Sequence, residues 1–136
     1  HLTETHIFPN PKSTYQMTFI AEILLLFVNI IMAYEHSYMI ERGQKIQHGW
    51  WGLGYLGFAI SLALICKSYL LFVASLFIRK VFFDTALNYF RELPIFHVST
   101  TTTSLIDKLH YKLFGKHSEI YTTIYFIVLL FIQFFL

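Results

Sequence analysis

The stretch WWGLGYLGFAISLALICKSYLLFVASLFI, residues 50–78, is the longest apolar run in the chain. As one helix it would be about 43 Å long, whereas the hydrocarbon core of a bilayer is about 30 Å thick. Lys67 and Ser68 interrupt the run. We therefore predict a tight turn at residues 66–68, between one membrane span over 50–66 and another that starts at Ser68.

The composition also favours a bilayer. Of 136 residues, 56% are hydrophobic and 13% are charged, whereas soluble domains usually carry about 25% charged residues. A chain this short cannot bury so much apolar surface in one water-facing core. We expect a single membrane domain over 1–136. The net charge of +2 is too small to indicate a nucleic-acid partner.

Two further segments have the length and composition of membrane spans. MTFIAEILLLFVNIIMAY, residues 17–34, would form a helix of about 27 Å. EIYTTIYFIVLLFIQFFL, residues 119–136, follows Ser118, a suitable N-cap residue. The predicted fold class is all-α: a polytopic integral membrane protein with about four transmembrane helices plus a short amphipathic interfacial helix.

Beyond the apolar run lies RKVFFDTALNYFREL, residues 79–93, with five charged side chains. Pro94 is the first strong helix stop, so the helix from Ser68 is predicted to run to about Glu92, with an interfacial C-terminal part. At 100° per residue, one arc of this helix is polar. It contains Lys80, Asp84, Asn88 and Arg91. The favoured interpretation places this polar stripe in water at the membrane surface; the alternative turns it into the bundle as a site.

The interfacial helix is predicted over residues 105–114. Ser104 and Asp107 resemble a capping box, and Gly115 is a suitable C-terminal stop. Its apolar residues recur at helical spacing: Leu105, Ile106, Leu109, Leu113 and Phe114. We expect this helix to lie flat on the membrane surface or on the bundle.

The distribution of Lys and Arg predicts the orientation. With four spans, eight of the ten basic residues fall on one side of the membrane, and Lys12 and Lys67 fall on the other. Because cytoplasmic loops are enriched in Lys and Arg, that side is predicted to be cytoplasmic. Both termini would then lie outside, in a cell inner, plasma or organelle membrane.

Several polar residues near the cytoplasmic end are candidates for catalysis. They are Lys80, Asp84, Asn88, Arg91, His97 and Asp107. Arg91 and Lys80 could hold a phosphate-bearing head group of a lipid-like substrate. His97 or Asp84 could then act as general base.

His36 and His48 are candidate metal ligands because the first two spans could bring them together. The spacing matches no established metal-binding motif, so solvated or hydrogen-bonded histidines are the simpler interpretation. The sequence leaves the cofactor undetermined.

The first two spans carry features of helix packing. Glu22, Asn29 and His36 are spaced by seven and share one face. Polar contacts between helices are the favoured use of this face, and an ion or proton path is the alternative. Gly57 and Ser61, with Gly54, form a small-residue face that predicts close helix contact.

The leading hypothesis for function is a structural or accessory subunit that packs against itself or a larger membrane complex. The chain is small, and it contains neither a nucleotide-binding loop nor a serine-hydrolase elbow. A membrane-interface enzyme and an ion or proton channel or transporter remain as alternatives. Whether the chain is an enzyme is left open.

Overall fold

The computed structural model describes residues 11–98 and 104–136, and every regular element in these two ranges is a helix. The all-α fold class is therefore confirmed. The elements are α2 (Pro11–Glu41), α3 (His48–Ile65), α4 (Tyr69–Ile78), the π-helical turn η1 (Arg79–Phe83), α5 (Asp84–Phe90), α6 (Leu105–Phe114) and α7 (Ser118–Ile132).

Helix α2 is longer than the predicted span over 17–34 at both ends, because it begins at Pro11 and continues through polar residues up to Glu41. The first backbone break after it is Gly43, whose φ of 70° lies in the left-handed region that glycine adopts without strain. A polar sequence alone does not end a helix; a residue that leaves helical backbone geometry does.

The predicted turn between residues 66 and 68 is confirmed. Lys67 has a φ of 53°, and Ser68 is the extended N-cap of α4, where its hydroxyl accepts a hydrogen bond from the Leu71 amide. The two helices on either side form an antiparallel hairpin, and α3 lies against α4.

The helix predicted from Ser68 to about Glu92 is also present, as the continuous series α4, η1 and α5 over residues 69–90. Its interior contains a π-helical turn that the sequence did not predict. Such turns insert one residue into a helix and rotate the side chains beyond it. The helix ends at Arg91, and Glu92 then has a φ of 58°.

The ends of α6 are as predicted: Ser104 is the N-cap and accepts from the Asp107 amide, and Gly115 is the C-cap with a φ of 62°. The start of α7 differs from the prediction that Ser118 is its N-cap. Ser118 is the first helical residue and His117 occupies the N-cap position. Helix α7 ends at Ile132, so it is shorter than the predicted span over 119–136.

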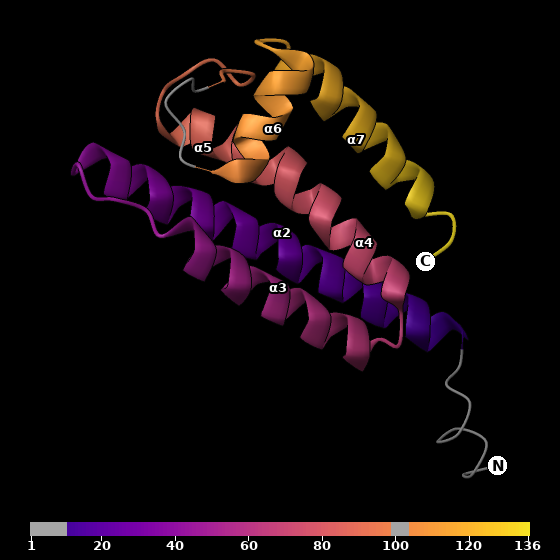
Figure 1. Ribbon diagram of the computed structural model, residues 1–136. Helices are drawn as coiled ribbons and strands as arrows, with labels where there is room; N and C mark the ends of the chain where they lie inside the picture. The colour runs from indigo at the N-terminus through magenta and orange to yellow at the C-terminus, as the bar shows by residue number, and fades with distance from the viewer. Residues whose placement is uncertain (1–10, 99–103) are drawn as a thin grey trace, which may run out of the picture.

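Helix α4 is central, because it lies against α2, α3 and α7. Figure 1 shows the α2–α3 connection, the end of α5 and the start of α6 at one end of the bundle, whereas the start of α2 and the C-terminal end of the chain lie toward the other end. The core between these helices is mostly apolar, with Asn29 and Ser75 as buried polar residues. Leu25, Leu71 and Ala74, from α2 and α4, are fully buried within it.

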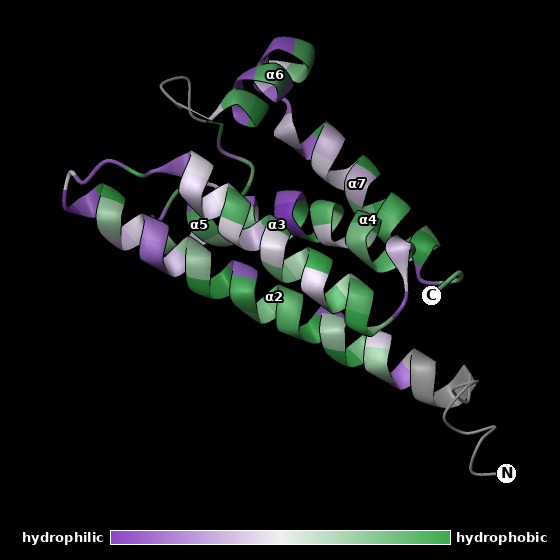
Figure 2. Cartoon of the chain, turned by 60° about the horizontal axis from the view of Figure 1, so that its bottom comes forward, coloured by the Kyte–Doolittle hydropathy of each residue, from purple (hydrophilic) through white to green (hydrophobic). Residues whose placement is uncertain are grey.

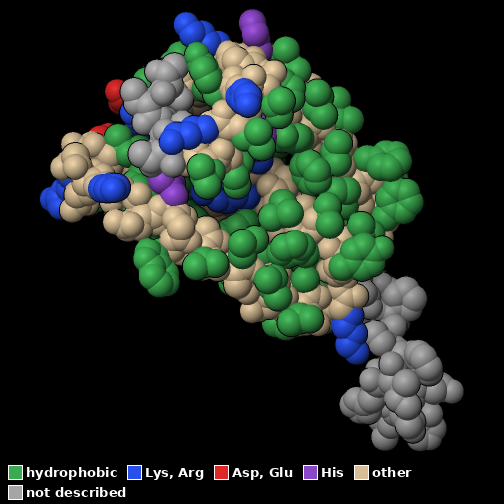
Figure 3. Space-filling model, in the orientation of Figure 1, with side chains coloured by type: hydrophobic (Ala, Val, Ile, Leu, Met, Phe, Trp, Pro, Cys, Tyr) green, Lys and Arg blue, Asp and Glu red, His purple; other side chains and the backbone are tan. Residues whose placement is uncertain are grey.

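The outside of the bundle is apolar as well. Large exposed hydrophobic side chains cover α2, α3 and α7, while most Lys and Arg side chains lie toward the end with the connections (Figure 3). Figure 2 shows the same division along the ribbon, with hydrophobic residues along α3, α4 and α7. Two of the described helices, Gln16–Glu41 and His48–Ile65, are long and apolar enough to cross a membrane.

Candidate functional site

The polar stripe on α5 is turned into the protein. Asn88 is buried, and the Lys80 side chain is only 12% exposed. The favoured expectation that this stripe faces water is therefore wrong for these two residues. The reason is tertiary: Asp107 of α6 pairs with Lys80, the Tyr121 ring of α7 lies beside the Lys80 ammonium group, and the carbonyls of Ile95 and His97 accept from Asn88.

Lys80 lies between two carboxylates. Its Nζ atom is 2.7 Å from Asp84 Oδ2 and 2.8 Å from Asp107 Oδ1, and it also lies 5.2 Å from the ring centre of Tyr121. The pairing with Asp84, four residues along the helix, is expected from sequence. The pairing with Asp107 ties α6 to η1 across 27 residues of chain.

Asn88 fixes the segment that follows α5. Its Nδ2 atom donates to the carbonyl of Ile95 at 2.7 Å and to that of His97 at 3.1 Å. The Ser118 hydroxyl donates to the carbonyl of Phe96, between them. Residues 95–97 are thus held between α5 and the start of α7.

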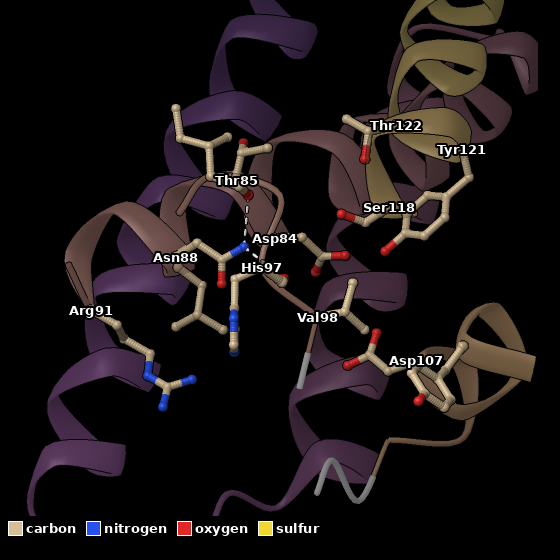
Figure 4. A pocket seen from close by; sticks show the side chains of 13 residues that line it. Asp84, Thr85, Asn88, Arg91, His97, Val98, Asp107, Ser118, Tyr121 and Thr122 are labelled. Atoms are coloured by element: carbon tan, nitrogen blue, oxygen red, sulfur yellow. Dashed lines mark hydrogen bonds between the residues drawn. The ribbon is translucent and has the colours of Figure 1, made fainter. Parts of the chain in front are cut away.

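These contacts surround a cavity of about 80 Å³ between α5, α6 and α7. Figure 4 shows polar side chains from these three helices around this space, with Asp84, Ser118 and Tyr121 close together. Five of the six residues predicted as catalytic line the cavity: Asp84, Asn88, Arg91, His97 and Asp107. The sixth, Lys80, bonds two of them from the side.

Sequence reasoning missed several polar residues of the cavity wall. They are Thr85, Tyr111, Ser118, Tyr121 and Thr122. One signal was present, because Ser118, Tyr121, Thr122 and Tyr125 follow the three- and four-residue spacing of a helix face. That polar face at the start of an otherwise apolar helix indicated a partner there.

The charges of this site balance internally. Lys80 and Arg91 are cationic, while Asp84 and Asp107 are anionic. Because the Lys80 ammonium group is paired with two carboxylates, the arrangement does not favour the phosphate-binding role predicted for it. Arg91 and the exposed His97 are the remaining basic side chains on the cavity wall.

Arg79, the residue before Lys80, points away from the cavity and toward Phe83 and Tyr55. The Arg79 guanidinium lies 3.5 Å from the ring centre of Phe83, and Tyr55 of α3 is a more distant neighbour at 5.9 Å. These are cation–π contacts on the side of the helix that faces α3. Arg79 and Lys80 therefore contact different parts of the bundle.

The two candidate metal ligands do approach each other, with ring centres 6.3 Å apart. His36 is buried; its Nδ1 atom donates to the Met32 carbonyl at 2.8 Å, and Trp51 and Phe83 pack edge-on against its ring. Among residues 11–98 and 104–136, no group of three or more His, Cys, Asp or Glu could hold a metal ion. A metal role for His36 and His48 stays a prediction.

Asn29 and Glu22, which share the face of His36 on α2, make contacts with other helices or their ends. Asn29 donates to the Tyr55 hydroxyl at 3.2 Å, and Tyr55 donates to the carbonyl of Ser75 at 2.6 Å. This chain of bonds joins α2, α3 and α4. Glu22 accepts a hydrogen bond at 2.7 Å from Gln133, the C-cap residue of α7. The favoured interpretation, polar contacts between helices, agrees with this geometry.

The small-residue face of α3 makes no close contact with another described helix, and Gly54 borders a cavity that Val28 and Met32 of α2 also line. A Cβ atom placed on Gly54 or Gly57 would have no neighbour within 4 Å, and Ser61 is exposed. The expected close contact is therefore absent within the described part of the chain. Tyr55 and Ala59 of α3 are buried instead, so α3 turns a different face to its neighbours.

Comparisons with protein-family models, with curated proteins and with solved structures found no match to this chain.

Proposed function

We propose that the chain crosses a membrane four times, with both termini outside and the connections α2–α3 and α5–α6 on the cytoplasmic side. The α2–α3 connection, the end of α5 and the start of α6 lie at one end of the bundle, and the start of α2 and the C-terminal end of the chain lie toward the other, which supports this topology (Figure 1). Two helices have the length and apolar character of a membrane span. The α4–α5 series and α7 would supply the other two crossings, α7 as a short one.

Labelling of single cysteines tests this topology. In a Cys66→Ala background, Arg42→Cys and Lys108→Cys should react with a membrane-impermeant maleimide from the same side, and Lys67→Cys from the other. All three side chains are exposed, so the bundle itself does not block the reagent. Reaction of positions 42 and 108 from opposite sides would exclude the proposed topology.

The proposed function is that of a structural or accessory subunit that acts through helix packing. The observation that carries it is that polar side chains bond one another inside the bundle, whereas the outer surface is largely apolar. Asn29, Glu22 and Lys80 are used for contacts between helices of the chain. The outer surface is largely apolar, and the face of α3 that contains Gly54 and Gly57 is open.

Gly57→Leu tests the subunit hypothesis. Because a Cβ atom at Gly57 would have no neighbour within 4 Å in the described part of the chain, we expect the variant to fold with an unchanged helix content. We expect native mass spectrometry to detect a higher-mass assembly for the wild type and not for Gly57→Leu, since a bulky residue keeps a partner helix away from this face. Leu64→Ala, on the exposed end of α3, is the control. A wild-type chain that is released only as a monomer would contradict the proposal.

The second candidate is a membrane-interface enzyme, and the cavity that gathers five predicted site residues favours it. The native mass spectra of the same variants distinguish this enzyme hypothesis from the subunit hypothesis. A bound lipid-like molecule that persists in Gly57→Leu and is lost in Arg91→Ala would support a substrate site, because Arg91 lines the cavity and Gly57 does not. The channel hypothesis gains no support from Glu22 and Asn29, since both are engaged in bonds between helices.

A further inference from the structure

Helix α6 turns its apolar face away from the bundle. Four of its aliphatic side chains are more than half exposed: Leu105, Ile106, Leu109 and Leu113. An amphipathic helix that folds against a protein core normally buries such a face. None of the residues of α6 is buried. Among its apolar residues, Phe114 shares the side of Asp107 and His110 and packs on the Tyr121 ring, with ring centres 5.4 Å apart, whereas the four aliphatic side chains point outward.

The polar face makes the attachment. Asp107 bonds Lys80 at 2.8 Å, and His110 bonds the Tyr125 hydroxyl at 2.8 Å. The His110 ring also packs against Tyr121, with ring centres 4.7 Å apart. These contacts hold one side of α6 to η1 and α7. They fix the rotation of the helix about its axis and keep the aliphatic side pointing outward.

Lysines accompany the exposed apolar face. At 100° per residue, Lys108 and Lys112 lie beside Leu105 and Leu109 on the helix surface, and Lys116 follows just beyond the helix. All three lysine side chains are exposed. In Figure 2, α6 stands at the edge of the molecule, next to the start of α7 and clear of α2 and α3.

We propose that α6 is a docking face for an anionic lipid leaflet, with its leucines in the acyl boundary and its lysines on the head groups. Charge complementarity selects this occupant, because lysines beside an apolar stripe bind anionic membrane surfaces. The inference rests on the proposed membrane topology. It adds the lipid class, anionic lipids, and the surface that binds them, the aliphatic and lysine side of α6.

Spin labels on single cysteines in vesicles test the proposal. In the Cys66→Ala background, the full chain carries one label at position 109, at position 44 in the α2–α3 connection, or at position 130 on the exposed side of α7. Vesicles contain either phosphatidylcholine alone or phosphatidylcholine with phosphatidylglycerol. Accessibility to oxygen reports lipid, and accessibility to a water-soluble nickel complex reports water.

In anionic vesicles, we expect the label at position 109 to show the high oxygen accessibility and low nickel accessibility of the label at position 130. In neutral vesicles, the label at position 109 should become accessible to the nickel complex. Because each lysine near an anionic surface favours binding by about fivefold, replacing all three by Gln should weaken docking by about 100-fold. A label at 109 that resembles position 44 in both vesicles overturns the proposal. Equal protection of the label at position 109 from nickel in neutral and anionic vesicles also overturns the proposal. Protection accompanied by spin coupling between two copies of the chain does so as well, because it would place a second copy on α6. Nickel access at position 130 instead refutes the membrane topology itself.

Discussion

Replacing Lys80 by Met should lower the free energy of unfolding by about 2 kcal/mol. The exchange keeps a long side chain but leaves Asp84 and Asp107 without the ammonium group that lies 2.7 and 2.8 Å from them. Removing one partner of a fully buried ion pair costs about 3–5 kcal/mol, and exposed pairs contribute about 0–1 kcal/mol. The exposures of 12%, 28% and 40% for the three side chains place this network between those limits.

Unfolding in mixed micelles with increasing dodecyl sulfate, followed by circular dichroism, measures the loss. Lys108→Met is the matched control, because its side chain is exposed and the same exchange there should change stability by less than about 0.5 kcal/mol. Adding Asp107→Asn to Lys80→Met should recover part of the loss, since it removes the charge of one of the two carboxylates that lose the ammonium group. Equal stability of the two Met variants would show that the Lys80 network does not hold α6.

Replacing Tyr55 by Ala should cost about 3 kcal/mol, whereas Tyr55→Phe should cost about 1 kcal/mol. The Ala exchange removes a buried ring between α2, α3 and α4 and leaves a cavity. The Phe exchange removes only the hydroxyl that accepts from Asn29 and donates to Ser75. Hydrogen bonds between helices in a membrane contribute about 1 kcal/mol or less, so the ring should dominate.

The same unfolding measurement applies to both Tyr55 variants. Tyr69→Phe is the control for the hydroxyl, because Tyr69 is 79% exposed at the start of α4. A Tyr55→Phe variant as unstable as Tyr55→Ala would show that the polar chain from Asn29 to Ser75, and not the packing of the ring, joins these helices.

The Tyr55 and Lys80 variants affect different parts of the bundle. Tyr55 joins α2, α3 and α4 in its interior, where the chain is predicted to lie in lipid. Lys80 joins η1, α5 and α6 near the cavity. Loss of the Lys80 contacts should therefore change the cavity and the orientation of α6 while α2 and α3 keep their packing. That separation allows any activity of the cavity to be tested without unfolding the spans.

The sequence by itself determined where the helices lie and where most of them end. The apolar runs, the interruption at Lys67 and Ser68, the stop before Pro94 and the caps at Ser104 and Gly115 all act through local sterics and hydrogen bonds. It also placed Lys80, Asp84, Asn88 and Arg91 on one helix face. These features depend on neighbours a few residues apart, which is why they can be read from a single chain.

Only the tertiary structure decided what those faces contact. Asp107, 27 residues beyond Lys80, completes the ion network, and Ser118 and Tyr121 of α7 close the cavity. The same arrangement turned the polar stripe inward and left Gly54 and Gly57 open. A helical period shows which residues share a face, but the partner of that face depends on how distant segments pack. A polar face can lie in water or meet another polar helix with the same local pattern.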